Sequence, residues 1–349
     1  MAIKKESKTV IGFIGQGYIG KNYADDFEGL GHPEGRIWKG HMKKIVVTGG
    51  AGFIGSHVVD ALVESGAEVV VIDNFSTGKK ENIEHVLDKI KLFDSTIVNT
   101  EFLKKIFKGA DAVVHLAASS SVLESIEFPM ETNTANTVGT LSVFTAALDA
   151  GVGRVVYASS SSVYGDTPVL PKVETMSTNP LSPYAIQKLT AELYGRIFCS
   201  TYGLKTIGLR YFNIFGPRQD PNSVYSAVIP KFIRLIKNGE RPIIYGDGEH
   251  TRDFTYVANA VAANLLALDA KSGFGESYNI AAGNRISLND LVDKINGILG
   301  TAVLPEYAEN RKGDIKDSFA DIKKAKETFG YEPTITFEEG LRCTVDSIK

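Results

Sequence analysis

The stretch Ile45-Val46-Val47-Thr48-Gly49-Gly50-Ala51-Gly52-Phe53-Ile54-Gly55 decides the fold of this chain. It joins a short β-branched run to a glycine-rich turn, and apolar residues at helical spacing continue from Phe53 to Val63. Glycines allow a tight turn and a close approach of the backbone to a pyrophosphate, whose charge the N-terminus of the helix stabilises. The spacing of Gly49, Gly52 and Gly55 differs from the usual G-x-G-x-x-G pattern. The strand–turn–helix order nevertheless predicts a dinucleotide site.

An acidic residue ends the next predicted strand. Asp73 follows Val69-Val70-Val71-Ile72, eighteen residues after Gly55. A carboxylate there accepts hydrogen bonds from the ribose hydroxyls of adenosine and repels a 2′-phosphate, which favours NAD over NADP. The alternative is an ordinary glycine-rich turn with a surface aspartate, and the flanking strand and helix disfavour it.

Further apolar runs repeat the pattern along the chain. Residues 112–116 and 155–158 suit strands buried on both faces, and Thr137 to Leu148 has helical spacing. This β–α alternation predicts an α/β fold, a Rossmann-type doubly wound parallel sheet. We expect it to span residues 42–213 as an NAD-binding domain.

The sequence changes character after Asn213. Glycine and proline become frequent, so we expect residues 214–349 to form a smaller, mixed α/β region. Two of its segments, Thr255-Tyr256-Val257 and Tyr278-Asn279-Ile280, are expected to return to the first domain.

The bulk composition excludes several classes of protein. The 349 residues are 43% hydrophobic and 23% charged, with a net charge of −3 that attracts neither nucleic acid nor an anionic membrane. Two cysteines, Cys199 and Cys343, fit a reducing compartment. Without a signal peptide or a long apolar run, a cytoplasmic protein is expected.

A second glycine pattern precedes the first domain. Gly15-Gln16-Gly17-Tyr18-Ile19-Gly20 follows an apolar run and resembles the opening of nucleotide-sugar dehydrogenases, but no strand ending in an acid follows it. We interpret residues 1–41 as an N-terminal extension, either a dehydrogenase-like remnant or an artificial addition, rather than a second cofactor site.

One predicted helix carries the candidate base. Tyr184 and Lys188 lie four residues apart and therefore on one helix face, where the ammonium would lower the pKa of the phenol. Ser182 is a plausible N-cap and Gly203 a plausible end. The residues expected to form the core-facing stripe of this helix are Ile186, Leu189, Leu193 and Ile197.

A run of four serines, Ser159 to Ser162, follows the fourth predicted strand. Residues just beyond strand ends line the ligand crevice of such sheets, so a hydroxyl there can hold a substrate hydroxyl while Tyr184 removes its proton. A polar surface loop is the alternative.

Ordered motifs along nearly the whole chain from Met42 resemble the extended short-chain dehydrogenase/reductase family, specifically its NAD-dependent nucleotide-sugar epimerases. They are His115-Leu116-Ala117-Ala118, Val163-Tyr164-Gly165-Asp166, Ser182-Pro183-Tyr184 with Lys188, Arg210-Tyr211-Phe212-Asn213, Gly216-Pro217-Arg218, Gly246-Asp247-Gly248 and Thr251-Arg252-Asp253-Phe254.

The resemblance implies roles for particular residues. Tyr184 would be the acid/base, Lys188 would lower its pKa and hold the nicotinamide ribose, and Ser160, three residues before Val163, would orient the substrate. The implied NAD contacts are Gly49, Gly52, Phe53, Ile54, Gly55, Asp73, Asn74, Asp94, Leu116, Ala117, Ala118, Asn136, Tyr184 and Lys188. The implied contacts with a UDP-sugar are Ser121, Ser160, Asn213, Val228, Tyr245, Arg252, Arg311, Asp314 and Ser318. No metal is implied.

Four positions bear on the reaction and the sugar. Ser161 and Ser162 replace the Asp-Glu pair of the family's dehydratases, so we expect C4 epimerisation through a 4-keto intermediate. Glu124 would repel a carboxylate and so favours a neutral hexose. Ser318 is small where a bulky aromatic would exclude a 2-acetamido group, so UDP-GlcNAc and UDP-GalNAc are expected substrates beside UDP-Glc and UDP-Gal.

Two alternatives stay open. One is a UDP-uronate 4-epimerase or decarboxylase, and the other is an NAD-binding regulatory protein without turnover. The resemblance also implies a homodimer formed through the helices near 137–148 and 184–202.

Overall fold

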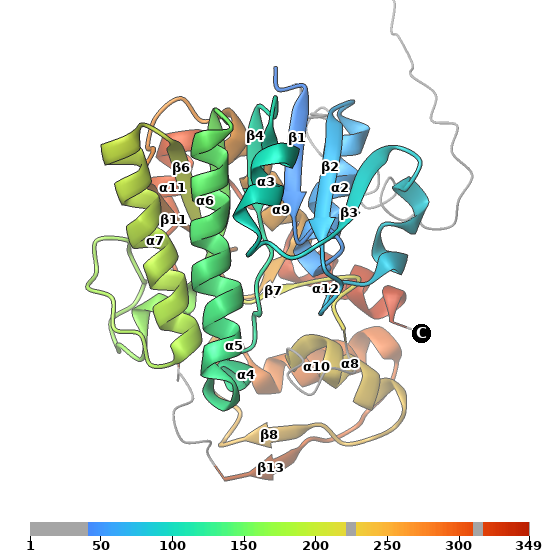
Figure 1. The fold of residues 1–349 in the computed structure, drawn as a ribbon. Helices are drawn as coiled ribbons and strands as arrows, with labels where there is room; N and C mark the ends of the chain where they lie inside the picture. Colours follow the sequence, from blue (N-terminus) through green and yellow to red (C-terminus); the bar gives the residue numbers. More distant parts are fainter. Residues whose placement is uncertain (1–40, 221–227, 310–316, 349) are drawn as a thin grey trace, which may run out of the picture. The chain divides into compact units, whose positions relative to one another are not determined.

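The computed structural model describes residues 41–220, 228–309 and 317–348 (Figure 1). The N-terminal glycine pattern at 15–20 and the predicted site residues Arg311 and Asp314 lie outside these ranges.

Seven strands form the main sheet, in the order β11-β6-β5-β4-β1-β2-β3, and every neighbouring pair is parallel. The predicted doubly wound Rossmann-type sheet is therefore confirmed. The direction of winding reverses between β1 and β4, where such sheets bind their ligands beyond the carboxyl ends of the strands. The strands are β1 (Lys44–Thr48), β2 (Glu68–Asp73), β3 (Ile90–Asp94), β4 (Ala112–His115), β5 (Arg154–Ser160), β6 (Lys205–Tyr211) and β11 (Glu276–Ile280).

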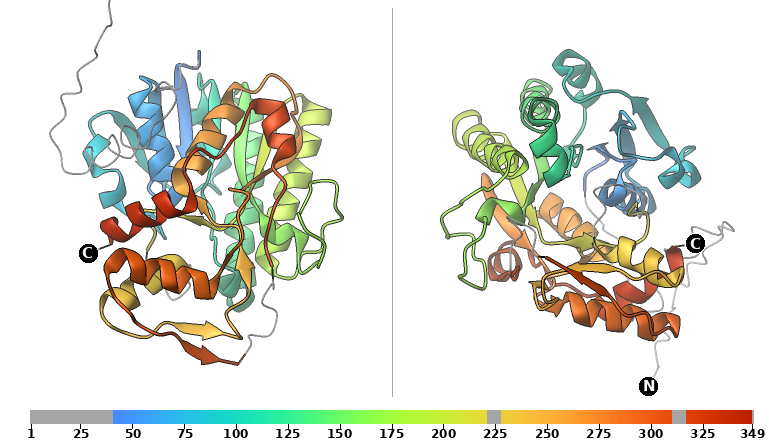
Figure 2. Two further views of the ribbon diagram at one scale, coloured as in Figure 1. Left: turned by 180° about the vertical axis from the view of Figure 1, so that it is seen from behind. Right: turned by 90° about the horizontal axis from the view of Figure 1, so that it is seen from below.

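Helices cover both faces of this sheet (Figures 1 and 2). Because successive side chains point to opposite faces, Val47 and Val71 pack beneath one layer and Val46 and Val70 beneath the other. The first layer is α2 (Phe53–Glu64), α9 (Val257–Asp269) and α11 (Lys323–Phe329); the second is α3 (Thr100–Phe107), α6 (Gly139–Asp149) and α7 (Pro183–Tyr202). Burial on both faces explains why the strands are continuous apolar runs.

Short elements connect the strands and helices. The segment predicted as a helix from Thr137 begins with a π-helical turn, and α6 follows it from Gly139. The connecting elements are η1 (Lys80–Asn82), η2 (Glu84–Val86), α4 (Val122–Glu127), α5 (Pro129–Asn133), η3 (Thr134–Val138) and η4 (Ser161–Tyr164).

Helix α7 has the predicted ends but a different buried face. The Ser182 hydroxyl accepts the Ala185 N–H at 3.2 Å, and Gly203 ends the helix with φ 77°. Of the predicted core-facing stripe, Leu189 is partly buried against a core cluster, but the prediction is wrong for Ile186, Leu193 and Ile197, which are 54%, 49% and 49% exposed. The residues that α7 buries are instead Tyr184, Ala185, Gln187, Lys188, Ala191, Glu192, Gly195 and Phe198.

The described residues of the C-terminal region form small sheets and five helices, two of which, α9 and α11, pack on the main sheet. Three two-stranded sheets pair β7 with β10 and β8 with β13 in parallel, and β9 with β12 in antiparallel fashion. The elements are β7 (Ile214–Phe215), α8 (Val228–Lys237), β8 (Ile243–Tyr245), β9 (Thr251–Arg252), β10 (Thr255–Tyr256), β12 (Ile286–Ser287), α10 (Leu288–Leu299), β13 (Glu306–Ala308) and α12 (Phe337–Ser347).

Three segments from this half of the chain join the main sheet or its layers. Tyr278 to Ile280 belong to β11, the strand beside β6, α9 packs against α2 on one face, and α11 packs against β11. Thr255-Tyr256 does not reach the main sheet, since it pairs with Ile214-Phe215 in a small sheet of its own.

Candidate active site

The glycine turn is packed against the end of β4. Gly49 has φ 72°, and a Cβ added there would lie 2.5 Å from the Ala117 nitrogen. A Cβ at Gly55 would collide with the Gly49 carbonyl oxygen. Glycine is therefore required at both positions, and the turn brings the predicted residues Leu116 and Ala117 beside Gly49.

Helix α2 begins directly after this turn. Gly52 is its N-cap, and within the described residues no side chain caps the helix. The first amides of a helix have no intrahelical acceptor, so those of the first turn, which begins at Phe53 and Ile54, point at the space beyond β1. This end of α2 can hold an anion such as a pyrophosphate.

Asp73 braces the glycine turn. Its carboxylate accepts the N–H groups of Ala51 and Phe75, both at 2.9 Å. Burial raises its pKa above the ordinary value, and those two hydrogen bonds oppose that effect. Asp94 ends β3 in register with Asp73, and Asn74 is exposed at the end of β2. The predicted acids therefore lie side by side at one edge of the crevice.

The side chain of Asn136 is hydrogen-bonded to other residues of the protein. Its side chain accepts the Ser119 N–H at 2.8 Å and donates to the Ser119 carbonyl and to Gln187 at 2.8 and 2.7 Å. Both amide hydrogens are used, so this residue ties the loop containing Ala118 to α7. That arrangement favours a structural role over the predicted direct contact with NAD.

Tyr184, Lys188 and Ser160 come together where β5 ends. Lys188 donates to the Ala158 carbonyl at 3.1 Å, and its Nζ lies 5.8 Å from the centroid of the Tyr184 ring. The Tyr184 N–H donates to the Ser125 hydroxyl at 3.0 Å, which anchors the start of α7 on α4. Ser125 was not anticipated from the sequence, and no local pattern marks it.

Burial has the largest effect on the pKa values of Tyr184 and Lys188. It raises the pKa of Tyr184 above its ordinary value, while a hydrogen bond with Ser160 opposes the rise. Burial also lowers the pKa of Lys188 to about 8. Burial is the larger of the two causes that shift the pKa of Tyr184, and the predicted lowering of this pKa by Lys188 stays a prediction.

The four serines have different surroundings. Ser159 donates to Glu192, away from Tyr184, whereas Ser160 interacts with Tyr184 and accepts the Ser162 N–H at 3.2 Å. The Ser162 hydroxyl is buried without a hydrogen-bond partner among the described residues. Of the four, Ser160 has the geometry expected of the residue that orients the substrate.

Three predicted substrate residues meet on one side of the crevice. Asn213, with φ 38°, places its Nδ2 3.4 Å from the Ser318 hydroxyl. The Ser318 N–H donates to the carbonyl of Thr251 at 3.0 Å, next to Arg252. Tyr245 ends β8 and Val228 begins α8, both in the C-terminal region.

Ser121 has a structural task in addition to its predicted one. It is the N-cap of α4, and its hydroxyl accepts the Glu124 N–H at 3.0 Å. Glu124 in turn accepts a hydrogen bond from Ser119 at 2.7 Å. The acid is thereby held next to Ser125, which contacts the backbone of Tyr184.

A family model described as the NAD dependent epimerase/dehydratase family matches residues 45–281. The chain belongs to this family. The match begins at β1 and ends just after β11, so it covers every strand of the main sheet except the first residue of β1.

Solved structures of epimerase/dehydratases share this fold. The UDP-N-acetylglucosamine 4-epimerase of Methanobrevibacter ruminantium M1, in complex with UDP-N-acetylmuramic acid, is 43% identical with a TM-score of 0.84, covering 87% of this chain and 97% of its own. The UDP-glucose 4-epimerase of Thermotoga maritima, with UDP-glucose, is 40% identical with a TM-score of 0.83, covering 87% and 98%.

A relative with a different sugar matches over a similar length. The UDP-glucuronate 4-epimerase of Thermodesulfobacterium geofontis is 36% identical over 317 residues, 87% of this chain and 96% of its own. The comparisons therefore establish the epimerase/dehydratase family and leave the sugar to be argued from the site.

The epimerase/dehydratase site fits its cofactor, NAD. The Gly49 turn admits no side chain, the uncapped start of α2 suits a pyrophosphate, and the paired acids Asp73 and Asp94 disfavour a 2′-phosphate. The described residues contain no group of three or more side chains that could hold a metal ion. Nor does any described helix have the length and apolar character to cross a membrane.

Proposed function

We propose that this NAD-dependent nucleotide-sugar 4-epimerase interconverts UDP-GlcNAc and UDP-GalNAc, and that it also turns over UDP-Glc and UDP-Gal. The observation that carries the proposal is the small side chain at position 318, a serine. This half-buried side chain lies 3.4 Å from Asn213, another predicted substrate residue. A serine there leaves room for a 2-acetamido group that an aromatic ring would exclude.

The catalytic roles follow from the groups at the end of β5. Tyr184 takes the proton of the substrate 4-hydroxyl and later returns it, while Ser160 holds the same oxygen. Lys188, buried and bonded to the Ala158 carbonyl, supports the phenolate and the nicotinamide ribose. NAD, when bound, supplies the hydride acceptor and donor at C4. The keto sugar turns over between the two transfers, which inverts C4.

The rest of the chain divides between cofactor and substrate. Residues 42–213 hold NAD and 214–349 hold the UDP-sugar in this proposal. Arg252 and Arg311 suit the diphosphate, Tyr245 and Asp314 the uridine, and Val228 the wall of that site. Two cysteines in the whole chain support a cytoplasmic location.

A uronate substrate is the alternative that the site disfavours. Glu124 lies on α4 beside Ser125, which bonds the backbone of Tyr184, and its carboxylate is held in place by Ser119. A sugar carboxylate near this position would face a like charge, which costs binding energy in a partly dehydrated site. The family membership and an intact Tyr184–Lys188 pair argue against a regulatory protein without turnover.

A substrate panel tests the proposal. The purified protein should interconvert both UDP-N-acetylhexosamines and both UDP-hexoses, and should not epimerise or decarboxylate UDP-glucuronate. Ser318→Tyr should abolish turnover of the acetylated pair and spare the other, while Ser318→Ala, the matched control, keeps both. Turnover of only the non-acetylated pair by the unmodified protein would refute the assignment of the sugar.

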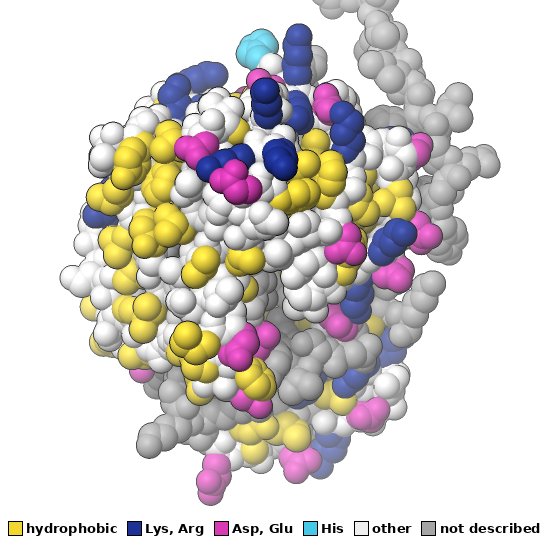
Figure 3. All heavy atoms as spheres, viewed as in Figure 1, with side chains coloured by type: hydrophobic (Ala, Val, Ile, Leu, Met, Phe, Trp, Pro, Cys, Tyr) yellow, Lys and Arg dark blue, Asp and Glu magenta, His cyan; other side chains and the backbone are white. Residues whose placement is uncertain are grey.

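We also propose that the protein is a homodimer formed through α6 and α7. The exposed side chains Ile186, Leu193 and Ile197 lie on one face of α7, and apolar side chains gather on the side of the molecule that carries these helices (Figure 3). Exposed apolar patches of this kind mark protein interfaces. In light scattering, Leu193→Glu should give a monomer, whereas Ile243→Glu, an exposed isoleucine on β8, should leave the dimer intact. A monomeric unmodified protein would contradict the proposal.

A further inference from the structure

A buried ion pair lies behind the candidate catalytic residues. Arg210, near the end of β6, donates from Nε and Nη2 to the two carboxylate oxygens of Glu192 on α7, at 2.8 and 2.6 Å. The side chains are 7% and 5% exposed. This forked arrangement fixes the relative position of strand and helix in two directions.

Hydrogen bonds extend from the pair to both ends of the catalytic serine loop. Glu192 also accepts the hydroxyl of Ser159, the residue directly before Ser160. Arg210 donates from Nη1 to the hydroxyl of Tyr164 at 2.8 Å, four residues after Ser160. The Tyr164 hydroxyl in turn donates to the side-chain carbonyl oxygen of Asn279 on β11 at 2.7 Å. The segment that contains Ser160 is therefore held on both sides.

The same face of α7 presents three residues to the end of β5. Tyr184, Lys188 and Glu192 are spaced by four residues, and one side of a helix carries such a set. Their partners are consecutive: Tyr184 interacts with Ser160, Lys188 with the Ala158 carbonyl, and Glu192 with Ser159. A shift of α7 along β5 would break all three contacts together.

We infer that Glu192 and Arg210 are positioning residues that hold Ser160 and Tyr184 in register for proton transfer at the substrate hydroxyl. The inference rests on the proposed epimerase function. Neither side chain is bonded to Tyr184, so both act through Ser159, Tyr164 and the packing of α7. Misplacement of a reacting group by about 1 Å can reduce a rate roughly 100-fold, which is why a buried clamp of this kind matters for catalysis.

Stability alone does not account for the pair. Removing two charges from water is costly, and buried ion pairs are often no better for folding than apolar side chains of similar volume. What the pair supplies is a set of directed bonds that apolar packing lacks. These bonds reach Ser159 and Tyr164, which precede and follow Ser160 in the sequence. Loss of the pair is therefore expected to lower the rate of the reaction.

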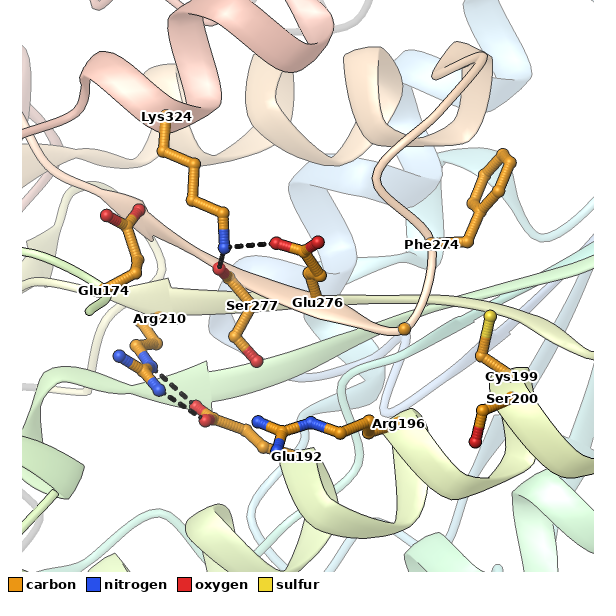
Figure 4. A pocket seen from close by; sticks show the side chains of 11 residues that line it. Glu174, Glu192, Arg196, Cys199, Ser200, Arg210, Phe274, Glu276, Ser277 and Lys324 are labelled. Carbon is orange, nitrogen blue, oxygen red and sulfur yellow. Dashed lines mark hydrogen bonds and ion pairs between the residues drawn. The ribbon is translucent and has the colours of Figure 1, made fainter. Parts of the chain in front are cut away.

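A pocket of about 620 Å³ lies beside the pair, and both Glu192 and Arg210 line it (Figure 4). Exposed residues, including Arg196 and Glu276, line it as well, so it is reached from the surface. Small solutes should therefore enter and occupy space left by a truncated Arg210. This permits a rescue experiment on the folded enzyme.

Two conservative variants test the inference. Glu192→Gln removes the charge but keeps the shape, and Arg210→Lys keeps the charge but loses the fork. We expect kcat to fall about 10- to 100-fold in each, with KM for the UDP-sugar within about twofold. The acid limb of the kcat profile should move to higher pH, because a displaced Ser160 no longer helps to lower the pKa of Tyr184.

Rescue and a matched control complete the experiment. Millimolar guanidinium chloride should restore part of kcat to Arg210→Ala but not to Tyr184→Phe, with sodium chloride as the salt control. Arg154→Ala removes another buried arginine, at the opposite end of β5, where it bonds carbonyls of α9 and the residue after it. It should lower the unfolding midpoint without changing the pH profile.

The outcomes separate the inference from the function on which it rests. If the unmodified protein turns over UDP-sugars but Glu192→Gln and Arg210→Lys keep its kcat and pH profile, the pair is structural and the inference is wrong. If those variants only unfold earlier, as Arg154→Ala does, the inference is wrong in the same way. An unmodified protein that turns over no nucleotide sugar would overturn the proposed function and, with it, the inference.

Discussion

Tyr184 is a buried phenol whose hydroxyl interacts with Ser160. Removing that hydroxyl leaves the ring, the packing and the backbone bond to Ser125 in place. Tyr184→Phe should therefore lower kcat about 100- to 10,000-fold, the usual contribution of a general acid or base. Product formation under saturating UDP-sugar measures the loss.

Two comparisons make the Tyr184 result specific. Binding of NAD and of UDP should be unchanged in Tyr184→Phe, and Tyr202→Phe, an exposed tyrosine at the end of the same helix, should keep full activity. A Tyr184→Phe protein with kcat near that of the unmodified chain would remove Tyr184 from the proposed mechanism.

His115 makes the fold sensitive to acid. It lies between the hydroxyls of Thr48 and Thr140, at 2.7 and 2.9 Å, and burial lowers its pKa to about 3. Unfolding restores a pKa of ~6.5, so below that pH only the unfolded chain takes up the proton. The stability contributed by neutral His115 is thus present above pH ~6.5 and is lost as the pH falls toward about 3.

A prediction about His115 concerns how steeply the free energy of unfolding changes with pH. His115→Gln should flatten the fall in the free energy of unfolding between pH 6.5 and 4 by up to about 1.4 kcal/mol per pH unit. Urea unfolding at several pH values measures this. His41→Gln, an exposed control, should leave the slope unchanged, and equal slopes for both variants would contradict the expectation.

At the scale of elements, α7 carries both the candidate catalytic groups and the surface proposed for dimerisation. Its first turn depends on Ser182, whose hydroxyl accepts the Ala185 N–H one residue after Tyr184. Ser182→Ala should cost roughly 1 kcal/mol in the free energy of unfolding, since the cap is lost and the amide stays without a protein acceptor. Ser200→Ala, exposed in the last turn, should change it by less than about 0.5 kcal/mol.

The boundaries of α7 could be predicted because caps are local. Ser182, Pro183 and Gly203 act on neighbouring backbone, and the structure confirms both ends. The buried face could not be predicted in the same way. Apolar spacing alone selected Ile186, Leu193 and Ile197, yet these are about half exposed, because the sheet side of α7 is occupied by Tyr184, Lys188 and Glu192 with polar partners.

At the scale of the whole molecule, Asp253 ties distant segments together. Its buried carboxylate accepts the N–H groups of Ala282, Gly283 and Asn284 through one oxygen and that of Ala320 through the other. The first three follow β11 of the main sheet, and Ala320 is two residues after Ser318. Asp253 thereby joins the sheet to the proposed sugar pocket.

Loss of this carboxylate should lower stability and weaken binding. Asp253→Ala should lower the free energy of unfolding by roughly 2–4 kcal/mol, because one buried and three partly buried hydrogen bonds lose their buried acceptor. KM for the UDP-sugar should rise as the segment near Ser318 loosens. The exposed Asp247→Ala should change neither, and urea unfolding with steady-state kinetics checks both. An Asp253→Ala protein as stable as the unmodified chain would contradict this prediction and show that other acceptors replace the carboxylate.

The sequence by itself determined what depends on neighbours along the chain. The strand–turn–helix at Ile45 to Gly55, the alternation of strands and helices, and the caps of α7 follow from glycine conformations, short-range hydrogen bonds and apolar spacing. Family motifs added Tyr184, Lys188 and Ser160, and the structure places these three together at the end of β5.

Only the tertiary structure decided what depends on residues far apart in sequence. It showed that Asn136 is bonded to Ser119 and Gln187, that Asn213 meets Ser318, and that Glu192 pairs with Arg210. It also exposed three of the four apolar residues expected on the buried face of α7, and its burial of Tyr184 raises the pKa of that phenol. Desolvation and long-range contacts arise only when the elements pack, because packing alone sets which polar groups leave water and which partners they then find.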